Sequence, residues 1–178
     1  MRWALLFLLL VAGGAGARAD VSGCACDPAQ PETMKRRECG LCREAENQQG
    51  EGVFFLKDIN PRKPNRWLAL PKRHIPGHHA MKDLTKEERA ELWAAAIQKA
   101  RELWGDEWGL AYNSDRVRTQ CHTHIHIGKL LKGLAPGKTM IVNGPADIPA
   151  LDGIWVHPKG KKLVVHYGEG ITETALLR

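Results

Sequence analysis

The sequence predicts a mixed fold in which several β-strands pack against one long amphipathic helix. Over 120–128 polar and apolar residues alternate, with three histidines at every second position, as in a strand with one buried face. Over 85–104 apolar residues recur at helical spacing. Short apolar runs bounded by turn residues supply the other strands.

Residues 1–19 are expected to be a secretory signal peptide. A basic residue precedes an apolar run over 3–11, and a small-x-small cleavage site ends at Ala19. The run is too short to span a bilayer, so we expect an exported protein, periplasmic or extracellular, that begins at Asp20. The alternative is a lipoprotein modified at Cys24, which is disfavoured because charged residues separate that cysteine from the apolar run.

The 178-residue chain suits one domain with its own core. We divide the part after the leader into a cysteine-containing segment (20–49), a core with the three histidines (50–131) and a C-terminal loop and hairpin (132–178). The formal net charge of +6 falls to +4 when cleavage of the leader removes Arg2 and Arg18. This balance suits an anionic substrate or membrane surface and is too weak to predict nucleic-acid binding.

Four of the five cysteines lie before residue 50, at Cys24, Cys26, Cys39 and Cys42. In an exported protein two disulfides are the default expectation. Cys39 and Cys42 also have the Cys-x-x-Cys spacing with which two thiolates chelate zinc. Both alternatives stay open at this point. The fifth, Cys121, is expected to be unpaired and packed in the core.

Two apolar runs, 52–56 and 67–71, are expected to pair as antiparallel strands. A turn that begins with Asp58 connects them. The second run ends in a cationic exit that holds His74. The main helix follows, with Thr85 as its N-cap and Glu88 completing a capping box.

A strand over 108–113 is expected to form a hairpin with 120–128. Arg116 and Arg118 lie on the connecting loop. Polar donors suited to a phosphate or ribose flank this loop, namely Asn113, Thr119 and Gln120. A further hairpin is expected from 154–157 and 163–167, with His157 and His166 as strand surface residues.

Three histidines on one strand face suit two kinds of chemistry. His122, His124 and His126 can bind a metal, because neutral imidazole is a common zinc ligand. Alternatively, one ring can attack phosphorus while its neighbours manage the phosphate and the protons. No carboxylate is evident near them in the sequence, whereas Asn, Gln, Thr and Arg are, and this favours a phosphate site.

The motifs resemble the histidine-triad (HIT) superfamily of nucleotide-phosphate hydrolases and transferases. Residues 122–128 are similar to its His-φ-His-φ-His-φ-φ motif, with Thr123 a departure at the first φ. Residues 58–75 are similar to its Asp-Ile-x-Pro…Pro-Lys-x-His-Ile block. The triad region, 118–126, is most similar to that of bacterial CDP-diacylglycerol pyrophosphatases, whereas the Cys-x-x-Cys motif resembles other bacterial members. The branch therefore stays open.

The resemblance implies an α+β fold, a HIT-like antiparallel sheet backed by one main amphipathic helix, to which the C-terminal hairpin is extra. It implies a hydrolase or nucleotidyl transferase that cleaves a nucleotide phosphoanhydride through a covalent histidine intermediate. His124 would be the nucleophile, with His126 and His122 as its catalytic neighbours. The nucleotide and its phosphates would be bound by Asp58, Asn113, Thr119, Gln120 and Arg118.

No cofactor is required for this chemistry, but the resemblance implies a structural Zn²⁺ held by Cys39, Cys42, His74 and His122. Expected partners are a nucleotide-containing small molecule or a CDP-lipid, with a membrane surface and a second copy of the chain as further candidates, and no nucleic acid. A metal-binding protein and a non-catalytic nucleotide-binding module are the alternatives.

Overall fold

The computed structural model describes residues 21–134 and 137–178, so the expected signal peptide lies outside the described residues. They form an α+β fold, as predicted, with one seven-stranded antiparallel sheet in the order β1-β2-β4-β3-β6-β7-β5. The strands are β1 Val53–Lys57, β2 Trp67–Pro71, β3 Trp108–Tyr112, β4 Ile125–Lys129, β5 Lys138–Val142, β6 Ile154–Lys159 and β7 Lys162–Tyr167.

One long helix, α3 Lys86–Trp104, has Thr85 as its N-cap and the predicted capping box. The other helices are short: η1 Val21–Gly23, α1 Pro31–Met34, η2 Arg37–Cys39, α2 Gly40–Glu46, η3 Met81–Asp83, η4 Pro145–Asp147 and η5 Thr172–Ala175. Within the part of the chain that the structure describes, no helix combines the length and apolar character needed to cross a bilayer.

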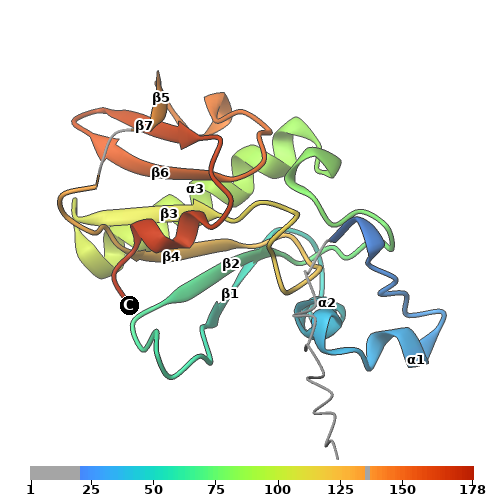
Figure 1. Cartoon of the computed structure of the whole chain (residues 1–178). Coiled ribbons are helices and arrows are strands. Elements are labelled where there is room, and N and C mark those ends of the chain that lie inside the picture. The colour runs from blue at the N-terminus through green and yellow to red at the C-terminus, as the bar shows by residue number, and fades with distance from the viewer. Residues whose placement is uncertain (1–20, 135–136) are drawn as a thin grey trace, which may run out of the picture.

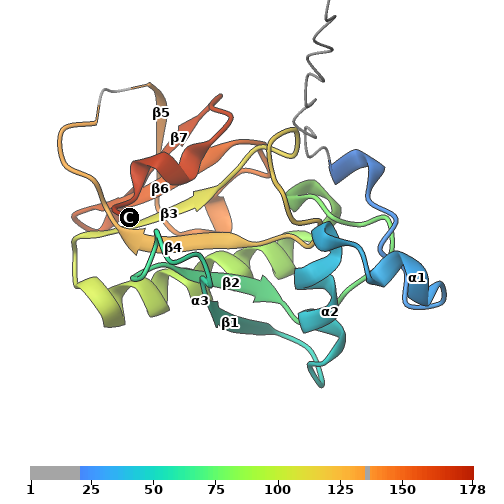
Figure 2. The ribbon, with the colours of Figure 1, turned by 60° about the horizontal axis from the view of Figure 1, so that its bottom comes forward.

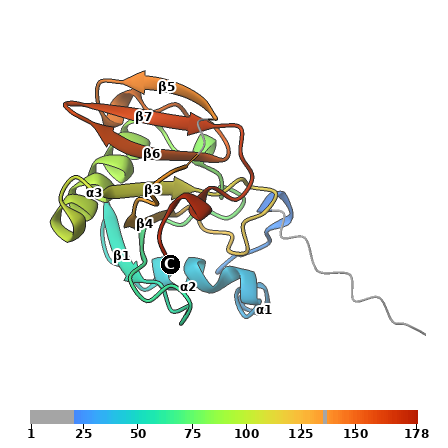
Figure 3. The same cartoon turned by 60° about the vertical axis from the view of Figure 1, so that its left-hand side comes forward.

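The predicted antiparallel pairs β1–β2, β3–β4 and β6–β7 are all present. The C-terminal hairpin continues the same sheet, because β6 pairs with β3. Figure 3 shows β5, β6 and β7 at one side of the molecule and α1 and α2 at the other. The pairing of β5 with β7 was not predicted.

The predicted strand over 120–128 is too long, since β4 begins only at Ile125. Side chains, rather than a neighbouring strand, bond the backbone just before it. Arg118 donates to the carbonyl oxygens of Cys121 and His122, both at 3.3 Å. The first two histidines of the triad therefore lie on a bent segment, and only His126 lies on the strand.

The two faces of the sheet are covered differently (Figures 1 and 2). On one face Ile125 and Ile127 join the main core with the apolar side of α3. On the other, α2 packs on β1 and β2, and η5 packs on β3 and β6. His126 pairs across the sheet with Leu68 and Ala111, which belong to these two clusters. The triad therefore lies between the N-terminal helices and the C-terminal end of the chain.

Candidate active site

His124 has the hydrogen bonding of a neutral imidazole with an unprotonated Nε2. Its Nδ1 lies 2.7 Å from the carbonyl oxygen of His122. Since a carbonyl oxygen only accepts, Nδ1 carries the proton and Nε2 keeps its lone pair. Burial is the main cause that lowers the pKa of His124 well below its usual value, and His126 and Arg118 add to it. The ring is therefore neutral at pH 7, as attack on phosphorus requires.

His126 stands beside His124, with its ring centroid 5.0 Å from that of His124. Its Nε2 lies 3.4 Å from Nδ2 of Asn113, at the end of β3. Burial, followed by Arg66 and Lys63, lowers the pKa of His126 well below its usual value. The predicted residues His124, His126 and Asn113 are thus brought together.

A carboxylate that sequence analysis missed completes this group. Oε2 of Glu173, on η5, lies 3.7 Å from Nδ1 of His126. The same oxygen contacts Nζ of Lys63 and lies 3.1 Å from a terminal nitrogen of Arg66. The expectation that no carboxylate lies near the histidines is therefore wrong. No local signal could have found Glu173, because it follows the triad by about 50 residues in the sequence. Only the packing of η5 on the sheet brings it next to His126.

His122 is the member of the triad that faces a different group of residues. Its Nε2 bonds the carbonyl oxygen of Pro71 at 2.8 Å. Its ring centroid lies 5.6 Å from that of His74, at the end of the β2 exit. Burial lowers the pKa of His122 to about 4, so this ring is also neutral at pH 7. Its carbonyl oxygen, by accepting from His124, orients the His124 ring.

A candidate metal site lies next to His122. One ligand atom each of Cys42, His74 and His79 lies within 4.8 Å of the others. Nε2 of His74 and Nδ1 of His79 are buried without a hydrogen-bond partner. Nδ1 of His74 contacts a carboxylate oxygen of Glu46 at 2.6 Å, which is how metal-bound histidines are commonly oriented. These residues fit a zinc ion, which prefers sulfur and nitrogen ligands.

The predicted zinc set is wrong in one ligand and differs in a second. Cys39 is bonded to Cys26, so its sulfur is not a free thiolate. His122 is not part of the three-residue group, and His79 takes a place that the sequence did not indicate. The adjacent pair His78-His79 was the available signal, but only the fold turns His79 inward while His78 stays exposed.

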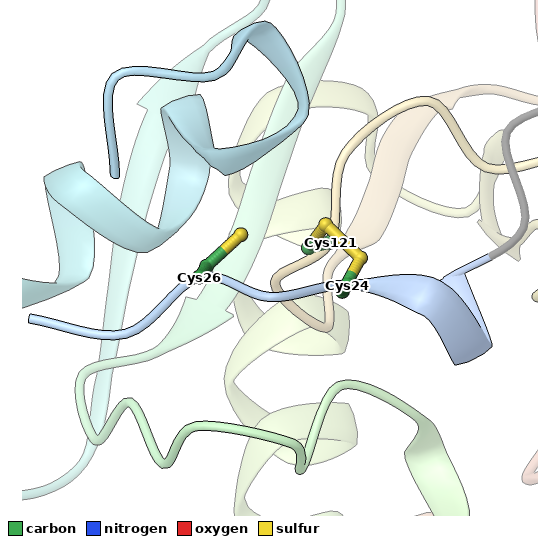
Figure 4. A group of neighbouring side chains, drawn as sticks. All are labelled: Cys24, Cys26 and Cys121. Carbon is green, nitrogen blue, oxygen red and sulfur yellow. A yellow bond between two sulfur atoms is a disulfide. The ribbon is translucent and has the colours of Figure 1, made fainter. Parts of the chain in front are cut away.

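The cysteine pairing agrees only in part with the expectation of two disulfides among the four N-terminal cysteines. Cys24 pairs with Cys121, and Cys26 pairs with Cys39 (Figure 4 draws the first bond, with Cys26 beside it). Cys42 is the free, buried cysteine. The expectation that Cys121 is unpaired is therefore wrong, and the disulfide alternative is half right. One bond attaches the N-terminal segment to the residue before His122.

Arg118 supports the triad segment rather than facing a ligand. Its side chain is 1% exposed, and it donates to the carbonyl oxygen of His79 at 2.6 Å and to Asp115 at 2.8 Å. Together with its bonds to Cys121 and His122, these contacts use both terminal nitrogens. The structure therefore gives Arg118 a positioning role instead of the predicted direct contact.

The other predicted binding residues are placed less centrally. Gln120 accepts from the backbone N–H of Leu41 at 3.1 Å and donates to the carbonyl oxygen of Arg37 at 2.9 Å, so its amide holds the N-terminal helices. Thr119 is exposed. Asp58 accepts from the backbone N–H of Asn60 at 2.9 Å and lies half-buried at the end of β1.

His166 differs from its expected place on the strand surface. It is buried, its ring stacks on Trp155 with centroids 3.4 Å apart, and its Nε2 lies 3.2 Å from Nε2 of His157. His157 is half-buried. Trp155 lies directly opposite His166 in the β6–β7 pair, and covers it.

Comparison with known proteins gives one partial similarity. The chain is 32% identical over 80 residues to a bis(5'-adenosyl)-triphosphatase from Dictyostelium discoideum, a match that covers 42% of this chain and 52% of that protein. The chain thus spans about half the length of this curated relative. No family model matches the chain. The similarity agrees with the histidine-triad resemblance and does not support the CDP-diacylglycerol pyrophosphatase branch.

Proposed function

We propose that this chain is a histidine-triad hydrolase that cleaves a phosphoanhydride bond of a nucleotide, with His124 as the nucleophile. The observation that carries the proposal is the bond from Nδ1 of His124 to the His122 carbonyl, which leaves Nε2 unprotonated. The similarity to a triphosphatase acting on a dinucleotide supports the same class of substrate.

In the first step, Nε2 of His124 attacks the α-phosphorus. The new N–P bond forms as the P–O bond to the leaving phosphate breaks, and the electron pair of that bond goes to the leaving oxygen. Water then attacks the nucleotidyl-histidine, forms a P–O bond, loses a proton and frees His124. Two easier displacements replace one difficult displacement. On this proposal His126 and Asn113, whose side chains lie beside each other, contact the phosphate oxygens.

Assays of the purified protein on nucleoside phosphoanhydrides test this proposal. The panel includes diadenosine triphosphate, nucleoside diphosphate compounds and CDP-diacylglycerol. We expect His124→Ala to lower kcat/KM on the order of 10⁴-fold or more, because it removes the nucleophile. His126→Ala should cost less, about 10²-fold. The exposed histidine variant His78→Ala is the matched control and should keep full activity.

Two outcomes would contradict the assignment. Wild-type kcat/KM in His124→Ala would exclude this histidine as the nucleophile. A reaction stopped under alkaline denaturing conditions, in which N–P bonds persist, should show by mass spectrometry one nucleotide attached to His124. Its absence under conditions of steady turnover would favour direct attack by water.

We also propose that the protein is exported and reaches its substrate outside the cytoplasm. The two disulfides support this, because such bonds persist mainly in oxidising compartments. CDP-diacylglycerol is a candidate substrate on this proposal, since its phosphoanhydride bond is of the same kind and its lipid part lies at a membrane face. N-terminal sequencing of exported protein should find Asp20, and a lipid-modified Cys24 would instead indicate a lipoprotein.

We further propose a zinc ion held by Cys42, His74 and His79, which supply three of the four ligands of a tetrahedral site. Burial raises the pKa of the Cys42 thiol to about 12, so its thiolate needs a cation close by. Bound zinc would stabilise the junction of α2 with the β2 exit. Elemental analysis should find about one zinc per chain, which is lost in Cys42→Ser. Cys39→Ser is the matched control and should keep the metal, because Cys39 lies in a disulfide. Loss of zinc in Cys39→Ser, with zinc kept in Cys42→Ser, would instead support a site that uses Cys39, as the sequence predicted.

A further inference from the structure

The C-terminal end of the chain is fixed to the sheet beside the triad. Two backbone bonds flank η5: Ser114 N–H donates to the carbonyl oxygen of Gly170 at 2.9 Å before it, and Leu177 N–H donates to that of Lys129 at 2.8 Å after it. Arg66, which is 1% exposed, donates to the carbonyl oxygens of residues 176 and 177. Because the anchors lie on both sides, η5 is a wall of the site and not a displaceable cover.

This wall decides how the Asn113 amide is turned. Oδ1 of Asn113 accepts from the backbone N–H of Glu173 at 3.0 Å and from the hydroxyl of Thr172 at 3.2 Å. With the oxygen engaged by two donors, the amide nitrogen faces Nε2 of His126 at 3.4 Å. An amide nitrogen only donates, so Nε2 of His126 is the acceptor and the proton of the neutral ring lies on Nδ1.

Glu173 also faces Nδ1, the protonated nitrogen of His126. Nδ1 of His126 is buried and has no hydrogen-bond partner, and Oε2 of Glu173 lies 3.7 Å away. Burial raises the pKa of Glu173, but Lys63 and Arg66 together lower it below its usual value, so the carboxylate is ionised at pH 7. The charged and titratable groups that face His126 are therefore Glu173 from η5, Lys63 and Arg66 from the β1–β2 connection, Arg118 from the β3–β4 loop, and His124.

We propose that Glu173 is the positioning residue of His126, and that it holds this ring in the Nδ1–H tautomer with the Nε2 lone pair turned toward Asn113. The backbone N–H of Glu173 holds the Asn113 amide, whose nitrogen faces Nε2 of His126. The carboxylate of Glu173 faces Nδ1 on the other side of the ring. The carboxylate also offsets the charges of Lys63 and Arg66, so that Nε2 of His126 can take up the proton that the attacking water loses in the second step. That last consequence rests on the proposed hydrolase function, whereas the tautomer does not.

Nitrogen-15 NMR of the histidine rings tests the tautomer directly. Spectra of the wild-type protein at pH 7, with the His126 signals assigned by their loss in His126→Asn, should show a protonated Nδ1 and an unprotonated Nε2. This result needs no enzymatic activity and no folded variant of Glu173. A protonated Nε2 in the wild-type protein would overturn the proposal.

The variant Glu173→Gln removes the charge and keeps a side chain of the same size. We expect a larger share of the Nε2–H tautomer, a fall in kcat of about tenfold with KM changed less, and an acidic limb of the pH–rate profile moved down by about one pH unit, because loss of the negative charge lowers the pKa of His126. Glu173→Asp keeps the charge and should recover part of kcat. Glu169→Gln is the matched control, because Glu169 lies on the same C-terminal segment but accepts from Trp155, at 3.0 Å.

These measurements distinguish a failure of the Glu173 proposal from a failure of the proposed hydrolase function. If Glu173→Gln shows the tautomer, kcat and pH profile of Glu169→Gln, Glu173 does not position His126, whatever the activity of the wild-type protein. If the wild-type protein cleaves no phosphoanhydride, the proposed function fails, and the NMR measurement still decides on Glu173. Should Glu173→Gln fail to fold, the wild-type spectrum and Glu173→Asp decide.

Discussion

Burial keeps His124 and His126 neutral, and fixed neighbours decide which nitrogen of each ring holds the proton. A backbone carbonyl does this for His124, and a side-chain amide does it for His126. Because neither partner can exchange donor for acceptor at these contacts, each ring has a defined tautomer. The proposed nucleophile, His124, is thus oriented by a hydrogen bond to the segment that carries it.

Arg118 is the residue that holds this segment in its bent shape. We expect Arg118→Lys to lower the free energy of unfolding by about 2–4 kcal/mol, because a lysine keeps the charge but cannot reach the carbonyl oxygens of Cys121, His122 and His79 together. Chemical denaturation measures the change. Arg116→Lys, at an exposed position of the same loop, should be neutral. Equal stability of the two variants would contradict the positioning role.

At the scale of elements, the N-terminal segment is stabilised by cross-links more than by a core of its own. Its helices α1 and α2 have four and seven residues, which is too short for stability in isolation. Cys24–Cys121 connects this segment to the triad loop, and the Gln120 amide adds two bonds to the same segment. The order of the N-terminal segment and that of the active site are therefore coupled.

The two disulfides should contribute unequally to stability. Their cysteines are separated by 97 and 13 residues. On the loop-entropy model the bond closing the long loop contributes about 4–5 kcal/mol and the short one about 3 kcal/mol. The double variant Cys24→Ser/Cys121→Ser should therefore lower Tm more than Cys26→Ser/Cys39→Ser. Thiol titration of unreduced, denatured protein should find one thiol, that of Cys42, and a count of three or more would contradict the pairing.

At the scale of the whole molecule, the site lies where the N-terminal and C-terminal segments meet on one face of the sheet. The opposite face is occupied by α3 and the main core. The arrangement places several neutral histidines in a buried region surrounded by cations. Protonating any of them on that face is unfavourable.

The stability of the fold should therefore fall in acid. The pKa values of His124 and His126 are lower in the folded chain than the usual value of about 6.5, so the unfolded chain binds more protons below that pH. The contribution of these neutral histidines to the free energy of unfolding is complete above about pH 7. It decreases as the pH falls toward 5. Tm measured from pH 7 to pH 5 on metal-free protein should decrease. His126→Asn should reduce the slope, while His78→Asn, at an exposed position, should leave it unchanged.

The sequence by itself determined most of the elements and predicted the nature of the chemistry. Period-two alternation, turn residues and the capping box are local signals, and they located β1, β2, β3, α3 and the β6–β7 hairpin. Local steric and hydrogen-bonding preferences act over a few residues, so they can be read without the fold. The spacing of the three histidines is local in the same sense.

Only the tertiary structure decided which distant residues complete the site. Glu173 meets His126, His79 joins Cys42 and His74, and Cys121 pairs with Cys24 rather than remaining free. Each of these contacts joins segments that are far apart in the chain, and their distances depend on strand order, on the register of the sheet and on where each loop turns. Such distances follow from the packing of the whole chain, because no local preference specifies them.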